Sequence, residues 1–133
     1  MLTRRAVHDG NGVWRKPDFY GPEHGSAFQL ASVVAAYPSR PPYPEAVFDR
    51  LSRLLPGTPC VVLDLGCGTG AMAHRLTDIV ERVDALDISA SKVEAGKRLP
   101  GGDDPRLRWM VGRAEDAPLD PPYSLVTAAA SLH

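Results

Sequence analysis

One stretch near the middle of the chain constrains the fold more than any other. Residues 60–65 read Cys-Val-Val-Leu-Asp-Leu, an apolar run with one late carboxylate that leads directly into the turn Gly66-Cys67-Gly68-Thr69-Gly70. A continuous apolar run of this length predicts a strand buried on both faces. The pattern over 71–77 then predicts a helix. The stretch therefore predicts a strand, a glycine-rich turn through which the backbone can approach a ligand closely, and the exposed N–H donors of a helix start.

The rest of the chain predicts where this unit sits. Apolar runs predict further strands over 83–88, 107–111 and 125–129, a helix capped by Ser89 and running to about residue 98, and a helix from Pro44 to about residue 55. Strands that alternate with short helices indicate βαβ units, so we expect an α/β fold with a parallel sheet. We predict one Rossmann-like domain over 44–133. Residues 1–43 are rich in turn residues and are expected to form an irregular segment with a short helix over 26–36.

Composition excludes several classes of protein. With 133 residues, 44% of them apolar, the chain has room for one domain with its own core, which argues against a disordered chain or a coiled coil. The net charge of −1 gives no electrostatic case for nucleic acid, and no apolar run approaches the roughly 20 residues of a membrane helix. Cys60 and Cys67 form neither a disulfide framework nor a zinc motif. No apolar stretch follows Arg4-Arg5, so a secretion signal is not expected and we expect a cytoplasmic protein.

The glycine turn alone is compatible with two kinds of ligand. Gly66-x-Gly68-x-x-Ala71 fits a relaxed dinucleotide fingerprint, and Asp87 follows Gly66 by 21 positions, where an acid that binds a ribose is expected. Asp64 favours a different ligand, because a carboxylate two residues before the first glycine would repel a pyrophosphate. The same carboxylate would attract the sulfonium and ammonium groups of S-adenosylmethionine. An NAD-binding Rossmann domain remains the competing interpretation.

The whole segment from Val62 to Gly70 resembles motif I of the class I S-adenosylmethionine-dependent methyltransferases. Weaker likenesses follow at Ala85-Leu86-Asp87-Ile88-Ser89, at 111–119 and at 125–133, and Pro41-Pro42-Tyr43-Pro44 is similar to the type 11 branch, which acts on small molecules. The resemblance covers about residues 37–133. It implies a Rossmann-like parallel sheet with flanking helices, in the strand order 3-2-1-4 of a seven-stranded fold that is truncated here after strand 4.

The resemblance also implies which residues bind the donor S-adenosylmethionine. Asp64 and the turn would hold its amino-acid end, Asp87 its ribose, and Ala128 would offer backbone to the methionine portion. The segment after the third strand would meet the adenine, although Arg113 stands where the family often has Asp. The full set of expected cofactor-binding residues is Tyr37, Arg40, Asp64, Gly66, Cys67, Gly68, Gly70, Asp87, Ile88, Ala114, Glu115, Asp116 and Ala128.

The implied activity is methyl transfer to a small-molecule acceptor, with no metal and no assigned catalytic base. His133 is the one candidate base, and His74 is expected on the surface of its helix. Each acid has a structural alternative: Asp64 could cap the turn, Asp87 could cap the following helix, and Glu115 and Asp116 could be solvated turn residues. The truncated sheet leaves strand 4 as an exposed edge. We expect the chain to be a fragment of a longer enzyme; the alternatives are a second chain or a homo-oligomer that covers this edge, and a natural remnant that binds the donor. A non-catalytic module that binds the donor is therefore the second hypothesis for function.

Overall fold

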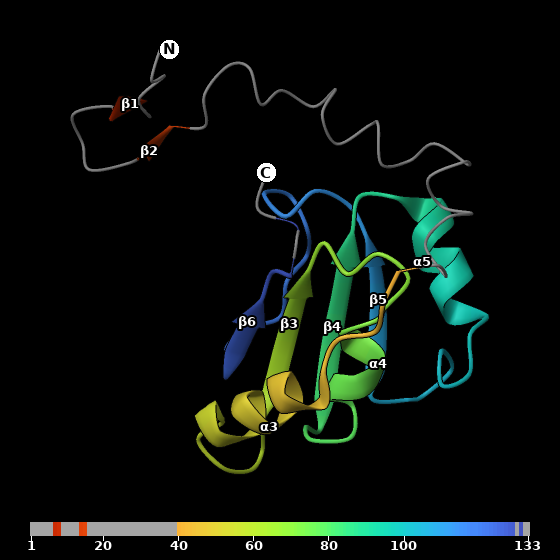
Figure 1. Ribbon diagram of the computed structural model, residues 1–133. Helices are drawn as coiled ribbons and strands as arrows, with labels where there is room; N and C mark the ends of the chain where they lie inside the picture. Colours follow the sequence, from red (N-terminus) through yellow and green to blue (C-terminus); the bar gives the residue numbers. More distant parts are fainter. Residues whose placement is uncertain (1–6, 9–13, 16–39, 130, 132–133) are drawn as a thin grey trace, which may run out of the picture.

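The described residues are built around a four-stranded parallel sheet (Figure 1). The structure is a computed structural model that describes residues 7–8, 14–15, 40–129 and 131. Its strands β3 (Val61–Leu65), β4 (Arg82–Asp87), β5 (Leu107–Val111) and β6 (Leu125–Thr127) lie in the order β5-β4-β3-β6. In chain order this is the predicted arrangement 3-2-1-4, which is confirmed. Strand β6 is two residues shorter than expected.

Three helices connect and cover these strands. Helix α3 (Glu45–Leu54) begins directly after Pro44, as predicted, and α5 (Ala90–Lys97) is capped by Ser89, whose side chain accepts a hydrogen bond from the Lys92 amide. Helix α4 (Ala73–Leu76) is shorter than the predicted 71–77, because the glycine turn extends through residue 72 before the chain becomes helical.

All three helices lie on one face of the sheet. Phe48 of α3 and Leu76 of α4 belong to the same buried cluster as Val62 and Val83, which are register partners on β3 and β4. Helix α5 reaches the same face at Gly96, where an added Cβ would lie 2.6 Å from the Trp109 ring. Figure 1 shows α3 and α4 in front of the sheet. The core therefore lies between these helices and the central strands.

The loop between β5 and β6 packs on part of the opposite face, where a charged network is buried. Asp84 of β4 is fully buried and forms ion pairs with Arg82, at 3.1 Å, and with Arg108, at 3.3 Å. Tyr123 of the loop donates a hydrogen bond of 2.7 Å to Asp84 Oδ2. A buried carboxylate needs such partners, so the network fastens the loop to the sheet.

The remaining expectations meet the structure only in part. Near the start of the chain, β1 (Val7–His8) pairs antiparallel with β2 (Trp14–Arg15), which sequence reasoning did not predict. The helix expected over 26–36 lies outside the described residues. Within the described part, β6 pairs only with β3. That a second chain covers the free edge of β6 stays a prediction. The cytoplasmic location also stays a prediction. No helix among the described residues is long and apolar enough to cross a membrane.

Candidate functional site

The glycine turn is fixed to the neighbouring strand by its backbone. Gly66 and Cys67 both donate N–H bonds to the carbonyl of Leu86, at 2.8 and 3.0 Å. Gly66, Gly68 and Gly70 have φ values of 69°, 58° and 86°, the left-handed region that glycine adopts without strain. At Gly66 a side chain is excluded as well, because an added Cβ would lie 2.3 Å from Ser131 Cβ. The turn thus has a single well-defined conformation at the carboxyl end of β3.

Asp64 presents one unpartnered carboxylate oxygen at this end of the sheet. Its side chain is only 1% exposed, and Oδ1 accepts a hydrogen bond of 2.7 Å from Thr127 Oγ1. Oδ2 is buried and has no hydrogen-bond partner in the described part of the chain. Burial raises the pKa of Asp64 from 3.8 to about 6, against the effect of the Thr127 hydrogen bond. A buried oxygen without a partner is costly unless a ligand supplies the donor.

Asp87 joins the glycine turn to the start of α5. Its Oδ2 accepts the N–H of Gly68 and its Oδ1 accepts the N–H of Ser89, both at 2.8 Å. The carboxylate is therefore a structural connection between the turn and the residue that caps α5. The helix-capping alternative is wrong in its detail, because Ser89 and not Asp87 is the N-cap of α5. Each oxygen keeps a second acceptor site, so this role leaves room for a ligand hydroxyl on each.

A cleft of about 400 Å³ opens beside Asp64 and the turn. The segment 40–43, the turn and α4 line it. Arg75 is also a lining residue; its guanidinium donates a hydrogen bond to Glu45 and lies 4.4 Å from the centre of the Phe48 ring. Of the expected donor-binding residues, the cleft is lined by Arg40, Asp64, Gly66 and Cys67.

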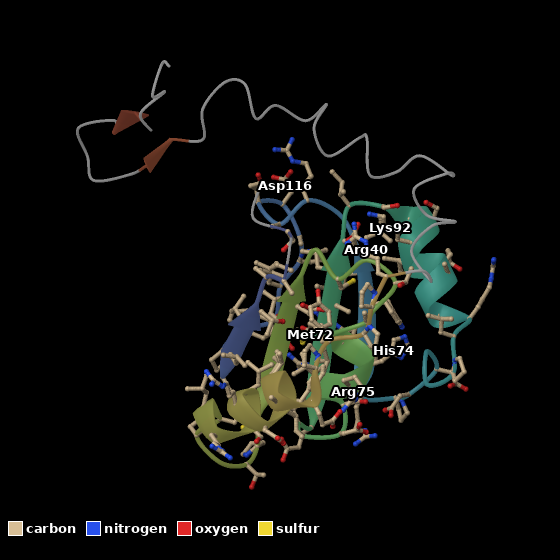
Figure 2. All side chains as sticks on the ribbon, in the orientation of Figure 1. Arg40, Met72, His74, Arg75, Lys92 and Asp116 are labelled. Carbon is tan, nitrogen blue, oxygen red and sulfur yellow. The ribbon has the colours of Figure 1, made fainter. Side chains whose placement is uncertain are left out.

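The residues expected around the adenine lie apart from this cleft. Figure 2 shows Asp116 beyond the carboxyl ends of the strands, away from Met72, His74 and Arg75 beside α4. Glu115 and Asp116 are exposed and lie 3.5 and 3.8 Å from the Arg113 guanidinium. Arg113 thus neutralises the acids that the sequence proposed for adenine, while Ile88 and Ala114 leave apolar surface open nearby.

Some single residues differ from the sequence expectation. His74 is not a surface residue: both ring nitrogens are buried, and the ring packs edge-on against Trp109 at 5.6 Å. Burial raises the pKa of the Cys67 thiol, so this residue stays protonated and serves as a small apolar side chain. Ala128 is half-buried, and the next residue, Ala129, lines the cleft. Tyr37 and His133 lie outside the described residues.

Sequence reasoning missed Thr127, the hydrogen-bond partner of Asp64. The sequence does show a hydroxyl residue in the apolar strand Leu-Val-Thr. Its contact with Asp64 could not be predicted, because it depends on the strand register that places Thr127 opposite Asp64. Sequence reasoning also missed Gly96. A Cβ added at this position would lie 2.6 Å from the Trp109 ring and 2.7 Å from the carbonyl oxygen of Thr69, so only glycine leaves room for both groups. This glycine lets α5 pack directly on the turn.

The comparison with protein families defines the class. A family model described as a methyltransferase domain matches residues 62–133, which is more than half of the chain. The chain therefore belongs to the methyltransferase domain family. Its parallel sheet in the order β5-β4-β3-β6, with flanking helices, matches the Rossmann-like methyltransferase fold. A search of curated proteins gave no significant match.

Solved structures agree with this assignment. A proposed type II methyltransferase from Anaeromyxobacter dehalogenans is 33% identical, with a TM-score of 0.57 over 67% of this chain and 36% of its own. An S-adenosylmethionine-dependent methyltransferase from Thiobacillus denitrificans, solved with S-adenosyl-L-homocysteine, is 20% identical, with a TM-score of 0.53 over 85% of this chain and 43% of its own. A TehB-like enzyme from Corynebacterium glutamicum is 23% identical, with a TM-score of 0.53, over 82% of this chain and 56% of its own. The last two show a shared fold, and the chain spans roughly a third to just over half of these proteins.

Proposed function

We propose that this chain binds S-adenosylmethionine at the carboxyl ends of β3 and β4 and forms the donor-binding part of a methyltransferase for a small-molecule acceptor. The observation that carries the proposal is the buried Oδ2 of Asp64, which lacks a partner in the described residues, in a side chain that lines the cleft. The α-ammonium of the donor would give this oxygen a charged hydrogen-bond donor. Such a contact contributes about 1.5–3 kcal/mol.

The occupied amides of the glycine turn argue against a dinucleotide. A pyrophosphate binds to free N–H groups of a glycine turn and of the helix start behind it. Here the N–H groups of Gly66 and Cys67 bond to Leu86, and that of Gly68 bonds to Asp87. Two buried carboxylates, Asp64 and Asp87, would add repulsion for a doubly charged ligand. Both observations favour a cationic ligand over NAD.

The remaining donor contacts follow from the same edge of the sheet. Asp87 would accept the two ribose hydroxyls through its free acceptor sites, and Ile88 with Ala114 would face the adenine. Arg40, which also lines the cleft, would bind the donor carboxylate, and the sequence assigns the same role to Tyr37. Gly68, Gly70 and Cys67 would shape the turn around the methionine portion, next to Ala128.

The chemistry asks little of the protein beyond binding and alignment. When bound, S-adenosylmethionine supplies a methyl group on a positively charged sulfur, which passes to a nucleophilic atom as the electrons of the broken S–C bond return to sulfur. Asp64 and the turn would fix the donor, and the cleft would limit water around the reacting atoms. A net charge of −1 supports a small acceptor over nucleic acid.

Calorimetric titration of the chain with S-adenosylmethionine, S-adenosylhomocysteine and NAD tests the proposal. We expect both sulfur ligands to bind and NAD not to bind. Asp64→Asn should weaken binding of S-adenosylhomocysteine about tenfold or more, because it removes one charge-assisted contact. The exposed Asp49→Asn on α3 is the matched control and should bind like the wild type. Binding of NAD without binding of either sulfur ligand would contradict the proposal.

Transfer itself needs a second assay. Incubation with S-adenosylmethionine labelled on its methyl group and a panel of small O, N and S nucleophiles should label at least one acceptor. Binding of the donor without transfer to any of them would favour the non-catalytic module.

A further inference from the structure

Thr127 touches the acid that carries the proposed function. It lies on β6 directly opposite Asp64 in the parallel pairing with β3, so both side chains point to the same face of the sheet. Its hydroxyl donates a 2.7 Å hydrogen bond to Asp64 Oδ1, and it is itself only 8% exposed. The contact joins residues 63 positions apart in the chain.

This bond fixes the direction of the carboxylate. The terminal torsion of an aspartate is soft, so a carboxylate held by nothing else can rotate its oxygens. With Oδ1 held by Thr127, the second oxygen has one orientation, buried and without a partner in the described residues, in a side chain that lines the cleft. A valine of the same shape would leave both oxygens of Asp64 without a donor.

We propose that Thr127 is a positioning residue for the amino group of the donor, because it holds Asp64 with Oδ2 directed at the α-ammonium. This inference rests on the proposed binding of S-adenosylmethionine. The hydroxyl has a second effect in the same direction, since its hydrogen bond lowers the pKa of Asp64 against the effect of burial and so favours the charged form.

The test compares two ligands that differ in the amino-acid portion. S-adenosylhomocysteine carries the α-ammonium, whereas 5′-methylthioadenosine has the same adenosine thioether without it. Thr127→Val should weaken binding of S-adenosylhomocysteine about tenfold or more and leave binding of 5′-methylthioadenosine unchanged. Thr127→Ser keeps the hydroxyl and should restore the affinity. Val126→Ala, on the other face of β6, is the matched control and should change neither affinity.

A double-mutant comparison completes the test. In an Asp64→Asn background, Thr127→Val should have almost no further effect on S-adenosylhomocysteine, because the carboxylate it positions is gone. Equal weakening of both ligands by Thr127→Val would show a merely structural hydroxyl and overturn the inference, as would an unchanged affinity for S-adenosylhomocysteine. If the valine variant does not fold, Thr127→Ala carries the same expectations. A wild-type chain that binds neither ligand would instead refute the proposed function.

Discussion

The burial of Asp64 lowers the stability of the ligand-free protein, whereas its proposed role is to bind the donor, and one substitution separates the two effects. Burial raises the pKa of this carboxyl from 3.8 to about 6. One pKa unit corresponds to about 1.4 kcal/mol, so the ionised carboxylate destabilises the folded state by about 3 kcal/mol above pH 6. Between pH 3.8 and 6 the folded state holds the proton and the unfolded state does not. Stability contributed by this group is therefore present at low pH and falls as pH rises through that window.

Asp64→Asn should remove this pH dependence. The amide keeps an oxygen that accepts from Thr127 and carries no charge, although its unpaired N–H group costs about 1–3 kcal/mol. We expect the stability of the variant minus that of the wild type to rise by about 2.4 kcal/mol between pH 4 and pH 8. Urea unfolding of the ligand-free proteins at both values measures it, and all other titrating groups cancel in the difference.

The control is Asp49→Asn, an exposed change on α3, whose difference from the wild type should be the same at both pH values. A flat difference for Asp64→Asn would refute the reasoning, because it would mean that the carboxylate is not destabilised by burial. The same variant should lose affinity for S-adenosylhomocysteine at pH 8. A stability difference that rises with pH, together with weaker binding, is the combined signature of a buried charge kept for a ligand.

Two further changes test the packing around the site. Gly70→Ala should lower the free energy of unfolding in urea by about 2–4 kcal/mol, because it forces a φ of +86° on alanine and sets a Cβ 2.5 Å from the Trp109 ring. The control is Gly57→Ala, where φ is positive but the space is open, and the loss should be only about 1–2 kcal/mol. Equal losses at the two positions would contradict the packing argument. Asp84→Ala should cost about 1–3 kcal/mol in thermal unfolding, because it leaves the Tyr123 hydroxyl without its Asp84 acceptor and removes the shared partner of two half-exposed arginines. Asp120→Asn, at an exposed pair, should cost under about 1 kcal/mol, and similar losses would argue against a buried network.

The parts of the fold that the sequence predicts are those set by local patterns. The apolar run before Gly66 marks β3, Pro44 marks the start of α3, and Ser89 marks the start of α5; all three lie where expected. The ends of two apolar runs also placed Asp64 and Asp87 at the carboxyl ends of their strands. Each of these features depends on residues within a few positions of one another, which is why composition and periodicity suffice.

The parts that escaped prediction depend on contacts between distant segments. The burial of His74 follows from Trp109, and the pairing of Thr127 with Asp64 follows from strand register. Arg113 looked like a lost adenine contact, and only the geometry shows it between Glu115 and Asp116. None of these is visible along the chain, because helical or strand periodicity reports which face a residue occupies and not what lies across from it.

Asp87 bonds to the backbone of the turn, and we propose that it also binds the ribose of the donor. A change in the ligand, and not in the protein, separates these two roles. Because both oxygens bond to backbone N–H groups, Asp87→Asn would place an amide donor against one of those donors and disturb the turn even without any ligand. Removing the hydroxyls from the ligand leaves the protein intact. S-adenosylhomocysteine and its 2′,3′-dideoxy analogue should differ in affinity by about 10-fold to 100-fold, because a carboxylate already held in place by Gly68 and Ser89 accepts both hydroxyls without losing side-chain freedom. Equal calorimetric affinities for the two ligands would mean that Asp87 serves the turn alone, and that the ribose lies elsewhere on this edge of the sheet.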